Sequence, residues 1–217
     1  MKTKVFNLII LDESGSMQSI KKEAIDSVNE TVQTIRAAEK KNEDQEHFVS
    51  LVTFNDDART VYDCVAATAV EELTAASYQP NCCTALYDAM GLSLNALRPR
   101  VKEEDRVLVT IITDGYENAS HEYSGNAIQA LVEELKGLGW VFAYIGANHD
   151  VKQVADSLSI TNTMTFQTTS EGTCYMTRRA NQSRARFFDR LSSACFNAVA
   201  ENNSFFEEED DDEPQNR

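Results

Sequence analysis

Three oxygen-bearing side chains stand at alternating positions directly after an apolar stretch near the start of the chain. They are Asp12, Ser14 and Ser16, and Gly15 separates the two serines. Side chains at alternate positions of a short loop can point to one place, and their oxygens suit a hard cation such as Mg²⁺. The same spacing also fits a helix start, in which a serine caps a helix that begins near Ser19.

A second carboxylate, Asp114, also ends an apolar run, over residues 106–113. Short apolar runs bounded by a turn signal predict buried strands. In open parallel sheets, ligands bind beyond the carboxyl ends of the strands, where the strand order reverses. If the two strands are neighbours, Asp12 and Asp114 face each other across that crevice. The first hydroxyl of the helix predicted over residues 84–97, on Thr84, can reach the same place.

Helical and strand patterns alternate along the chain. Helices are predicted over residues 20–35, 84–97, 127–138, 151–158 and 175–200. Strands are predicted over residues 5–12, 47–55, 59–64, 106–113, 140–147 and 163–167, with a hairpin turn at 55–57. Residues 65–80 are ambiguous. This alternation predicts an α/β fold: a doubly wound, mostly parallel, Rossmann-like sheet with one antiparallel edge strand and helices on both faces.

Composition narrows the class of protein. The 217 residues fit one domain, and no apolar run approaches the roughly 20 residues that cross a bilayer. We expect no signal peptide and no membrane association. The formal net charge of −15 argues against nucleic acid as a partner. The five cysteines have no disulfide-scaffold spacing, which favours reduced thiols and a cytoplasmic location. We also expect a monomer.

Seven consecutive acidic residues occupy positions 207–213. A block of like charge this dense repels itself, which predicts disorder. The expected organisation is therefore one domain over residues 1–204 and a disordered acidic tail over residues 205–217.

The ordered set of motifs resembles a von Willebrand factor A-type (VWA) domain. Residues 11–17 carry the Asp-x-Ser-x-Ser pattern, residues 84–89 begin with the threonine, and residues 113–115 carry Asp-Gly, in the family's order and near its usual spacing. These stretches look like the bacterial branch of the family, and the resemblance covers most of the chain.

This resemblance implies a metal-ion-dependent adhesion site that binds Mg²⁺, Mn²⁺ or Ca²⁺. The implied ligands are Asp12, Ser14, Ser16, Thr84 and Asp114, the carboxylates acting directly or through water. It implies a protein-binding function, in which an acidic residue of a protein partner completes the coordination of the cation. Five rim residues would help to choose that partner, or are merely solvated: Glu13, Tyr87, Tyr116, Glu117 and Asn118.

One departure from the family pattern precedes Thr84. Relatives often carry two glycines there, and this chain has Cys82 and Cys83. Glycine adopts positive φ freely and cysteine does not, so the loop is expected to take a different path. The two cysteines are predicted to be small, partly buried apolar fillers, because no Cys-x-x-Cys or nearby histidine supports a zinc site. A soft-metal or redox role is the alternative.

An enzyme is the competing class of function. Two carboxylates at strand ends with Mg²⁺ also describe phosphoryl-transfer sites, so Asp12 and Asp114 could serve a Mg²⁺-dependent phosphohydrolase. Such an enzyme would need a second aspartate where Ser14 stands and a nearby lysine, and no Gly-rich phosphate loop is present. A binding module rather than an enzyme is therefore expected.

Five arginines cluster in the last predicted helix of this acidic chain: Arg178, Arg179, Arg184, Arg186 and Arg190. They could form a solvated face whose stems cover apolar surface, a docking patch for an acidic partner or nucleic acid, or a patch masked by the tethered acidic tail. The solvated face is favoured, because Phe187, Phe188 and Leu191 interleave with the arginines and need burial.

Overall fold

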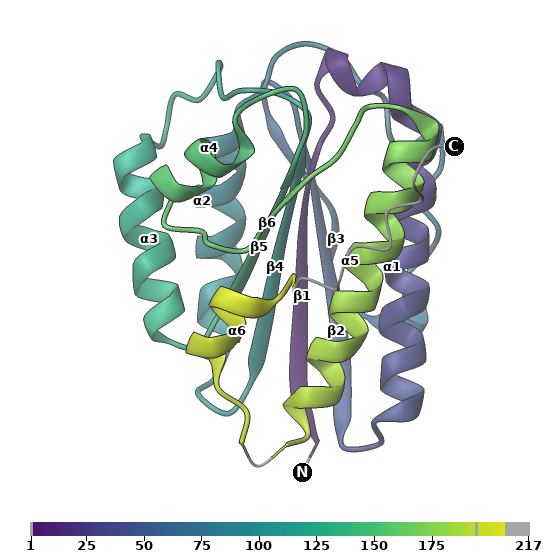
Figure 1. The fold of residues 1–217 in the computed structure, drawn as a ribbon, viewed down its shortest axis with the longest axis vertical. Coiled ribbons are helices and arrows are strands. Elements are labelled where there is room, and N and C mark those ends of the chain that lie inside the picture. The colour runs from purple at the N-terminus through teal and green to yellow at the C-terminus, as the bar shows by residue number, and fades with distance from the viewer. Residues whose placement is uncertain (1, 194, 207–217) are drawn as a thin grey trace, which may run out of the picture.

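The computed structural model describes residues 2–193 and 195–206, and it places one six-stranded sheet between two layers of helices (Figure 1). The strands are β1 (Thr3–Asp12), β2 (Gln45–Phe54), β3 (Ala58–Ala66), β4 (Arg106–Thr113), β5 (Val141–Gly146) and β6 (Thr163–Thr165). The α-helices are α1 (Lys21–Lys41), α2 (Leu86–Leu97), α3 (Gly125–Gly137), α4 (Val151–Ser157), α5 (Ser170–Leu191) and α6 (Ala198–Ser204). No helix in these residues is both long and apolar enough to cross a membrane.

The sheet confirms the predicted fold class. Its strand order is β3-β2-β1-β4-β5-β6, and every neighbouring pair is parallel except β2 and β3. The antiparallel strand β3 lies at one edge, as expected. Strand order reverses between β1 and β4, because β2 continues the sheet on one side and β5 on the other. The strands that end at Asp12 and Thr113 are therefore neighbours.

Helices cover both faces of the sheet. In Figure 1, α1 and α5 lie on one side, and α2, α3 and α4 lie on the other. The strands between them are buried on both faces, and in β1 every residue from Val5 to Asp12 is buried. Alternate residues of β1 join the two cores, Ile9 and Leu11 on the α1 side and Leu8 and Ile10 on the α2 side. A strand buried on both faces reads as a continuous apolar run, which explains why β1 was predictable.

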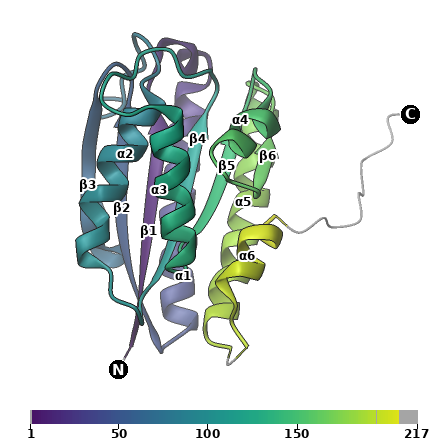
Figure 2. The ribbon, with the colours of Figure 1, turned by 90° about the vertical axis from the view of Figure 1, so that its left-hand side faces the viewer.

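The prediction of a single last helix over residues 175–200 is wrong. Helix α5 ends at Leu191, and α6 begins at Ala198 after a turn and packs beside β5 (Figure 2). Asn197 caps α6 by accepting a hydrogen bond from the backbone N–H of Val199 at 2.9 Å. Arg190 of α5 pairs with both carboxylate oxygens of Glu201 in α6, at 2.7 and 2.8 Å, which fixes the second helix against the first.

The predicted boundary of the acidic tail begins too early. Phe205 is buried, packs on Phe187 with ring centroids 5.9 Å apart, and belongs to the core on the α1 side. Phe206 packs against the same core. The domain body therefore continues through residue 206, while the acidic block at 207–213 lies outside the described residues.

The arginines of α5 do not form one solvated face. The Arg184 side chain is fully buried and donates to Thr110 of β4 at 2.9 Å and to Asn181 at 2.7 Å. Arg190 is held by Glu201. As predicted, Phe187 and Phe188 are buried, and Leu191 is partly buried. A long apolar stem allowed Arg184 to enter the interior, which the helical pattern alone did not indicate.

Candidate metal site

Asp12 ends β1 at the carboxyl edge of the sheet, and its carboxylate is held from two sides. Oδ1 accepts a hydrogen bond from the backbone N–H of Ser14 at 2.7 Å, and Oδ2 accepts one from the hydroxyl of Thr113 at 2.6 Å. The first contact folds the loop back over the strand end, and the second ties β1 to β4. Both contacts fix the orientation of a fully buried carboxylate.

The two serines of the loop and Asp114 form a connected group of oxygens. The hydroxyl oxygens of Ser14 and Ser16 lie 3.1 Å apart, and Ser16 donates to Oδ1 of Asp114 at 2.5 Å. These residues come from the loop after β1 and the loop after β4. The structure therefore brings together four of the five residues expected at the site, from positions about a hundred residues apart in sequence.

Thr84, the fifth expected residue, lies beside this group in the loop before α2. Its hydroxyl oxygen is 3.7 Å from the position that a Cβ at Gly115 would occupy. Asn118 clamps the backbone of Thr84, because its side chain accepts from the Thr84 N–H at 2.9 Å and its own N–H donates to the Thr84 carbonyl at 3.0 Å. The Thr84 hydroxyl faces the Asp114–Gly115 turn without hydrogen bonding to the serines or aspartates among the described residues.

The two cysteines before Thr84 differ from the prediction. Both thiols are exposed, so they are not buried fillers. Cys82 has φ of +60°, which is the conformation that glycine would adopt freely. The carbonyl of Cys82 accepts the N–H of Gly15 at 3.1 Å. This hydrogen bond joins the cysteine loop to the loop over residues 13–16, called the serine loop below. The backbone therefore takes the glycine-like path despite the cysteine side chain.

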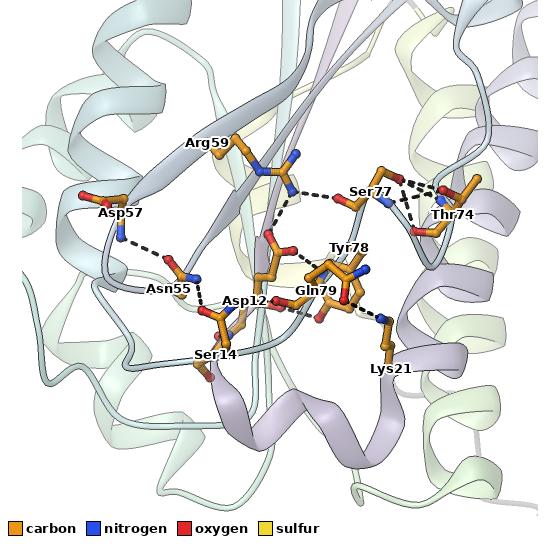
Figure 3. Close-up of polar contacts among 12 residues, drawn as sticks. Asp12, Ser14, Lys21, Asn55, Asp57, Arg59, Thr74, Ser77, Tyr78 and Gln79 are labelled. Atoms are coloured by element: carbon orange, nitrogen blue, oxygen red, sulfur yellow. Dashed lines mark hydrogen bonds and ion pairs between the residues drawn. The ribbon is translucent and has the colours of Figure 1, made fainter.

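Residues 65–80, which sequence analysis left ambiguous, contain side-chain and backbone groups that support the serine loop. The buried hydroxyl of Tyr78 donates to the Asp12 carbonyl at 2.6 Å (Figure 3). Glu13 is also buried and accepts from Arg59 at 3.0 Å and from the backbone N–H of Gln79. Arg59 in turn donates to the Ser77 carbonyl at 2.7 Å. Sequence analysis missed Tyr78 and Thr113, and for Thr113 the only signal was its place at the end of a buried strand.

Three of the expected rim residues make internal hydrogen bonds instead: Asn118, which holds Thr84, and the two glutamates Glu13 and Glu117. Glu13 is committed to the contacts above, and Glu117 accepts the backbone N–H groups of Tyr87, Ala119 and Ser120 at 2.7–3.0 Å. Neither carboxylate is a solvated loop group. Tyr116 remains about half exposed, and its hydroxyl accepts the N–H of Asp150 at 3.1 Å.

The electrostatics of the site reflect its burial. Burial raises the pKa of Asp12 to about 6, with the nearby Asp114 carboxylate adding to the rise and the hydrogen bonds from Thr113 and Ser14 opposing it. Burial also raises the pKa of Asp114, while the hydrogen bond from Ser16 lowers it. His149 lies close enough for Asp114 to favour its charged form, although burial lowers the pKa of this histidine overall. Two buried carboxylates side by side are costly without a compensating positive charge.

The residues present fit a hard divalent cation. In the part of the chain that the structure describes, no group of three His, Cys, Asp or Glu side chains could hold a metal ion. The candidate here depends on serine and threonine hydroxyls as well as carboxylates, and such oxygens suit Mg²⁺, Mn²⁺ or Ca²⁺. Adjacent ligands of octahedral Mg²⁺ lie about 3 Å apart when Mg–O is 2.0–2.1 Å, close to the 3.1 Å between Ser14 and Ser16.

Comparison with known families identifies the fold family. The model of the von Willebrand factor type A domain matches residues 8–181, so the chain belongs to this family. The matched range contains the whole candidate site. No curated protein sequence matches this one.

Solved structures share the fold at low sequence identity. The PilB minor pilin from Streptococcus sanguinis is 13% identical with a TM-score of 0.59, over 89% of this chain and 64% of that chain. The ArnB paralog VWA2 from Sulfolobus acidocaldarius is 18% identical with a TM-score of 0.55, over 83% and 45%. The vWF domain of the type V pili tip protein Mfa5 from Porphyromonas gingivalis is 11% identical with a TM-score of 0.56, over 84% and 96%. This chain thus spans less than two thirds of the first two.

Proposed function

We propose that this chain is a protein-binding domain that holds a divalent cation at the carboxyl edge of its sheet and recognises a carboxylate of a protein partner. The observation that carries the proposal is the convergence of the Ser14, Ser16 and Asp114 oxygens, at 3.1 and 2.5 Å, beside the fixed carboxylate of Asp12. Thr84 would complete the set from a third loop. Mg²⁺ is the preferred cation, with Mn²⁺ and Ca²⁺ as alternatives.

Some residues of the site orient the proposed ligands, and others would contact the cation directly. Thr113 and the Ser14 N–H keep the Asp12 carboxylate pointing at the site, and Asn118 keeps Thr84 beside it. Ser14 and Ser16 present hydroxyl oxygens. A bound cation would supply a positive centre that attracts a carboxylate oxygen of the partner.

The class of partner follows from the family and from charge. Domains of this fold occur in a minor pilin and in a type V pili tip protein. Both proteins are parts of pili, which supports a role for this chain in protein contacts. The net charge of −15 disfavours nucleic acid and anionic membranes as partners. We propose a monomeric bacterial module in the cytoplasm, where its five free cysteines would stay reduced.

Calorimetry with Mg²⁺ and Mn²⁺ tests the site. Wild type is expected to bind one ion, and Asp12→Ala is expected to lose binding because it removes the buried carboxylate. Asp63→Ala is the matched control, since Asp63 is an exposed aspartate that pairs with Arg100 far from the site. Equal binding by wild type and Asp12→Ala would overturn the site assignment. A pull-down with Mg²⁺ and with chelator would then test whether partner capture depends on the ion.

The phosphohydrolase alternative is less well supported by the geometry. Both carboxylate oxygens of Asp12 already accept hydrogen bonds, which favours a fixed structural ligand over an attacking nucleophile. Generic phosphoesters incubated with the protein and Mg²⁺ are expected to remain intact. Turnover that Asp12→Ala abolishes would establish the enzyme instead.

A further inference from the structure

A groove of about 800 Å³ lies at the end of the sheet opposite the candidate metal site. It is bounded by the segment before β4, the end of α3 and the start of α6, and Figure 2 shows the lower ends of α3 and α6 in this region. Leu138 and Val199 line it and are among the most exposed large apolar side chains described, at 60% and 68%. The groove therefore combines apolar walls with open access.

The charges that line this groove are unusual for so acidic a chain. Two acidic side chains line the groove, Glu103 and Asp105. Four cationic side chains line it as well: Arg98, Lys102, Arg106 and Lys136. The sequence as a whole has 35 acidic and 20 basic residues. The groove is thus a locally positive site on a negative protein, which would attract an acidic segment.

Three of these four cations have no ion pair among residues 2–193 and 195–206. Arg98 pairs with Glu134, whereas Lys136 donates only to the Ser159 carbonyl at 2.8 Å. Arg106 donates through Nη1 to backbone carbonyls, including that of Asp105 at 2.9 Å, and its Nε is buried without a hydrogen-bond partner in this part of the chain. Lys102 contacts the Asp105 carboxylate through its backbone N–H, at 2.9 Å, and its ammonium forms no ion pair in this part of the chain. No carboxylate in the described part of the chain therefore neutralises the charges of Lys102, Lys136 and Arg106.

The chain carries a complementary segment close to the groove. Residues 207–213 are seven consecutive acidic residues, directly after the last described residue, Phe206. Helix α6 begins at the groove with Ala198 and ends at Ser204, about 9 Å along its axis at 1.5 Å per residue, and Phe206 follows two residues later. Seven extended residues span about 23 Å, which is enough to return to the groove.

We propose that the acidic segment at residues 207–213 docks in this groove of its own chain. The arginines of α5 are the weaker site, because Arg184 is buried and Arg190 is already paired with Glu201. Tethering supplies a high local concentration of carboxylates, so contacts that are weak one by one are sufficient. High salt is expected to weaken the docking, because it screens the charges of the segment and of the groove.

Carbodiimide cross-linking of the full chain tests the proposal, because it joins lysine amines to carboxylates in contact. At low salt, residues 207–213 are expected to link to Lys102 and Lys136 within one chain, at about threefold or more the yield for exposed Lys152. The excess should disappear in roughly 0.5 M salt, where charges are screened within a few ångströms. Arg106→Gln and Arg98→Gln, which remove groove charge and keep both lysines, should each reduce it.

Three outcomes would overturn the proposal. The first is equal yield at Lys152 and at the groove lysines, which would mean random encounters. The second is cross-linking found only between two chains, which would show docking in trans. The third is an excess that survives high salt and both arginine variants, which would mean that charge does not hold the segment there. Mass spectrometry of the separated monomer distinguishes these cases.

Discussion

The hydroxyl of Thr113 donates a 2.6 Å hydrogen bond to Oδ2 of Asp12 and thereby joins the carboxyl ends of β4 and β1 at the candidate metal site. Both residues are fully buried. The contact places an orienting donor behind the carboxylate, while the Ser14 N–H holds the other oxygen. The geometry at the point where strand order reverses thus depends on a residue that is not itself an expected ligand.

Replacing Thr113 by valine is expected to weaken both the fold and metal binding. Thr113→Val keeps the shape of the side chain and leaves a buried carboxylate without one donor, which costs about 1.5–3 kcal/mol of unfolding free energy. Loss of a supporting hydrogen bond to a metal ligand typically weakens metal affinity by about tenfold or more. Urea denaturation and Mg²⁺ calorimetry measure the two effects.

Thr53 provides the matched control for this change. It is fully buried in β2, and its hydroxyl has no hydrogen-bond partner among the described residues. Thr53→Val therefore removes an unsatisfied polar group and should leave stability equal or raise it by up to about 1 kcal/mol. If both valine variants lost the same stability, the Thr113–Asp12 bond would not be the cause.

The strands and the neighbouring carboxylates could be predicted because burial on two faces leaves a simple signal. The strands that end at Asp12 and Thr113 are continuous apolar runs, and alternation with helices predicts a parallel sheet. The adjacency of Asp12 and Asp114 then follows from the strand order.

The break between α5 and α6 and the contact of Tyr78 with Asp12 left no periodic signal in the sequence. Phe187, Leu191, Cys195 and Val199 keep helical spacing through the turn between α5 and α6, so the pattern concealed the break. Tyr78 lies in an irregular segment, and its contact with Asp12 spans 66 residues of sequence. Such contacts depend on the tertiary fold.

The vicinal cysteines allow a paired test of backbone strain. Cys82→Gly is expected to keep or raise the unfolding free energy, because relief of a left-handed conformation is worth about 1–2 kcal/mol and the entropy of glycine costs only about 0.5–1. Cys83 is not at positive φ, so Cys83→Gly should lose about 0.5–1 kcal/mol. Urea denaturation under reducing conditions compares them. A Cys82→Gly protein less stable than Cys83→Gly would contradict the strain argument.

Two helical glycines should respond oppositely to alanine. A Cβ at Gly91 in α2 would lie 2.5 Å from ring atoms of Tyr123, so Gly91→Ala is expected to lose about 1–3 kcal/mol by overpacking. A Cβ at Gly137, at the end of α3, meets nothing within 4 Å, and Gly137→Ala should gain about 0.5 kcal/mol from helix propensity. Thermal unfolding monitored by circular dichroism measures both. Equal effects of the two changes would show that Tyr123 moves aside freely.

His47 is expected to make the fold less stable in mild acid. Burial lowers its pKa from 6.5 to about 4, and the ring contacts Gln45 at 3.0 Å, Asn7 at 3.5 Å and the Phe188 ring. Between these two pH values the unfolded chain binds more protons at this residue than the folded chain. The stability contributed by the neutral histidine is therefore full above pH 6.5 and is lost as pH falls toward 4, by an amount on the order of 3 kcal/mol.

Comparison of pH profiles isolates this residue from other titrating groups. Asp12 acts in the opposite sense, because its raised pKa makes the folded chain bind more protons between pH 3.8 and about 6. Urea denaturation from pH 4.5 to 7.5 is therefore run on wild type and on His47→Gln, which share Asp12. The variant should lose less stability on acidification than wild type. The exposed histidine variant His121→Gln should follow wild type, and a His47→Gln profile parallel to wild type would exclude the buried histidine as the acid-sensitive group.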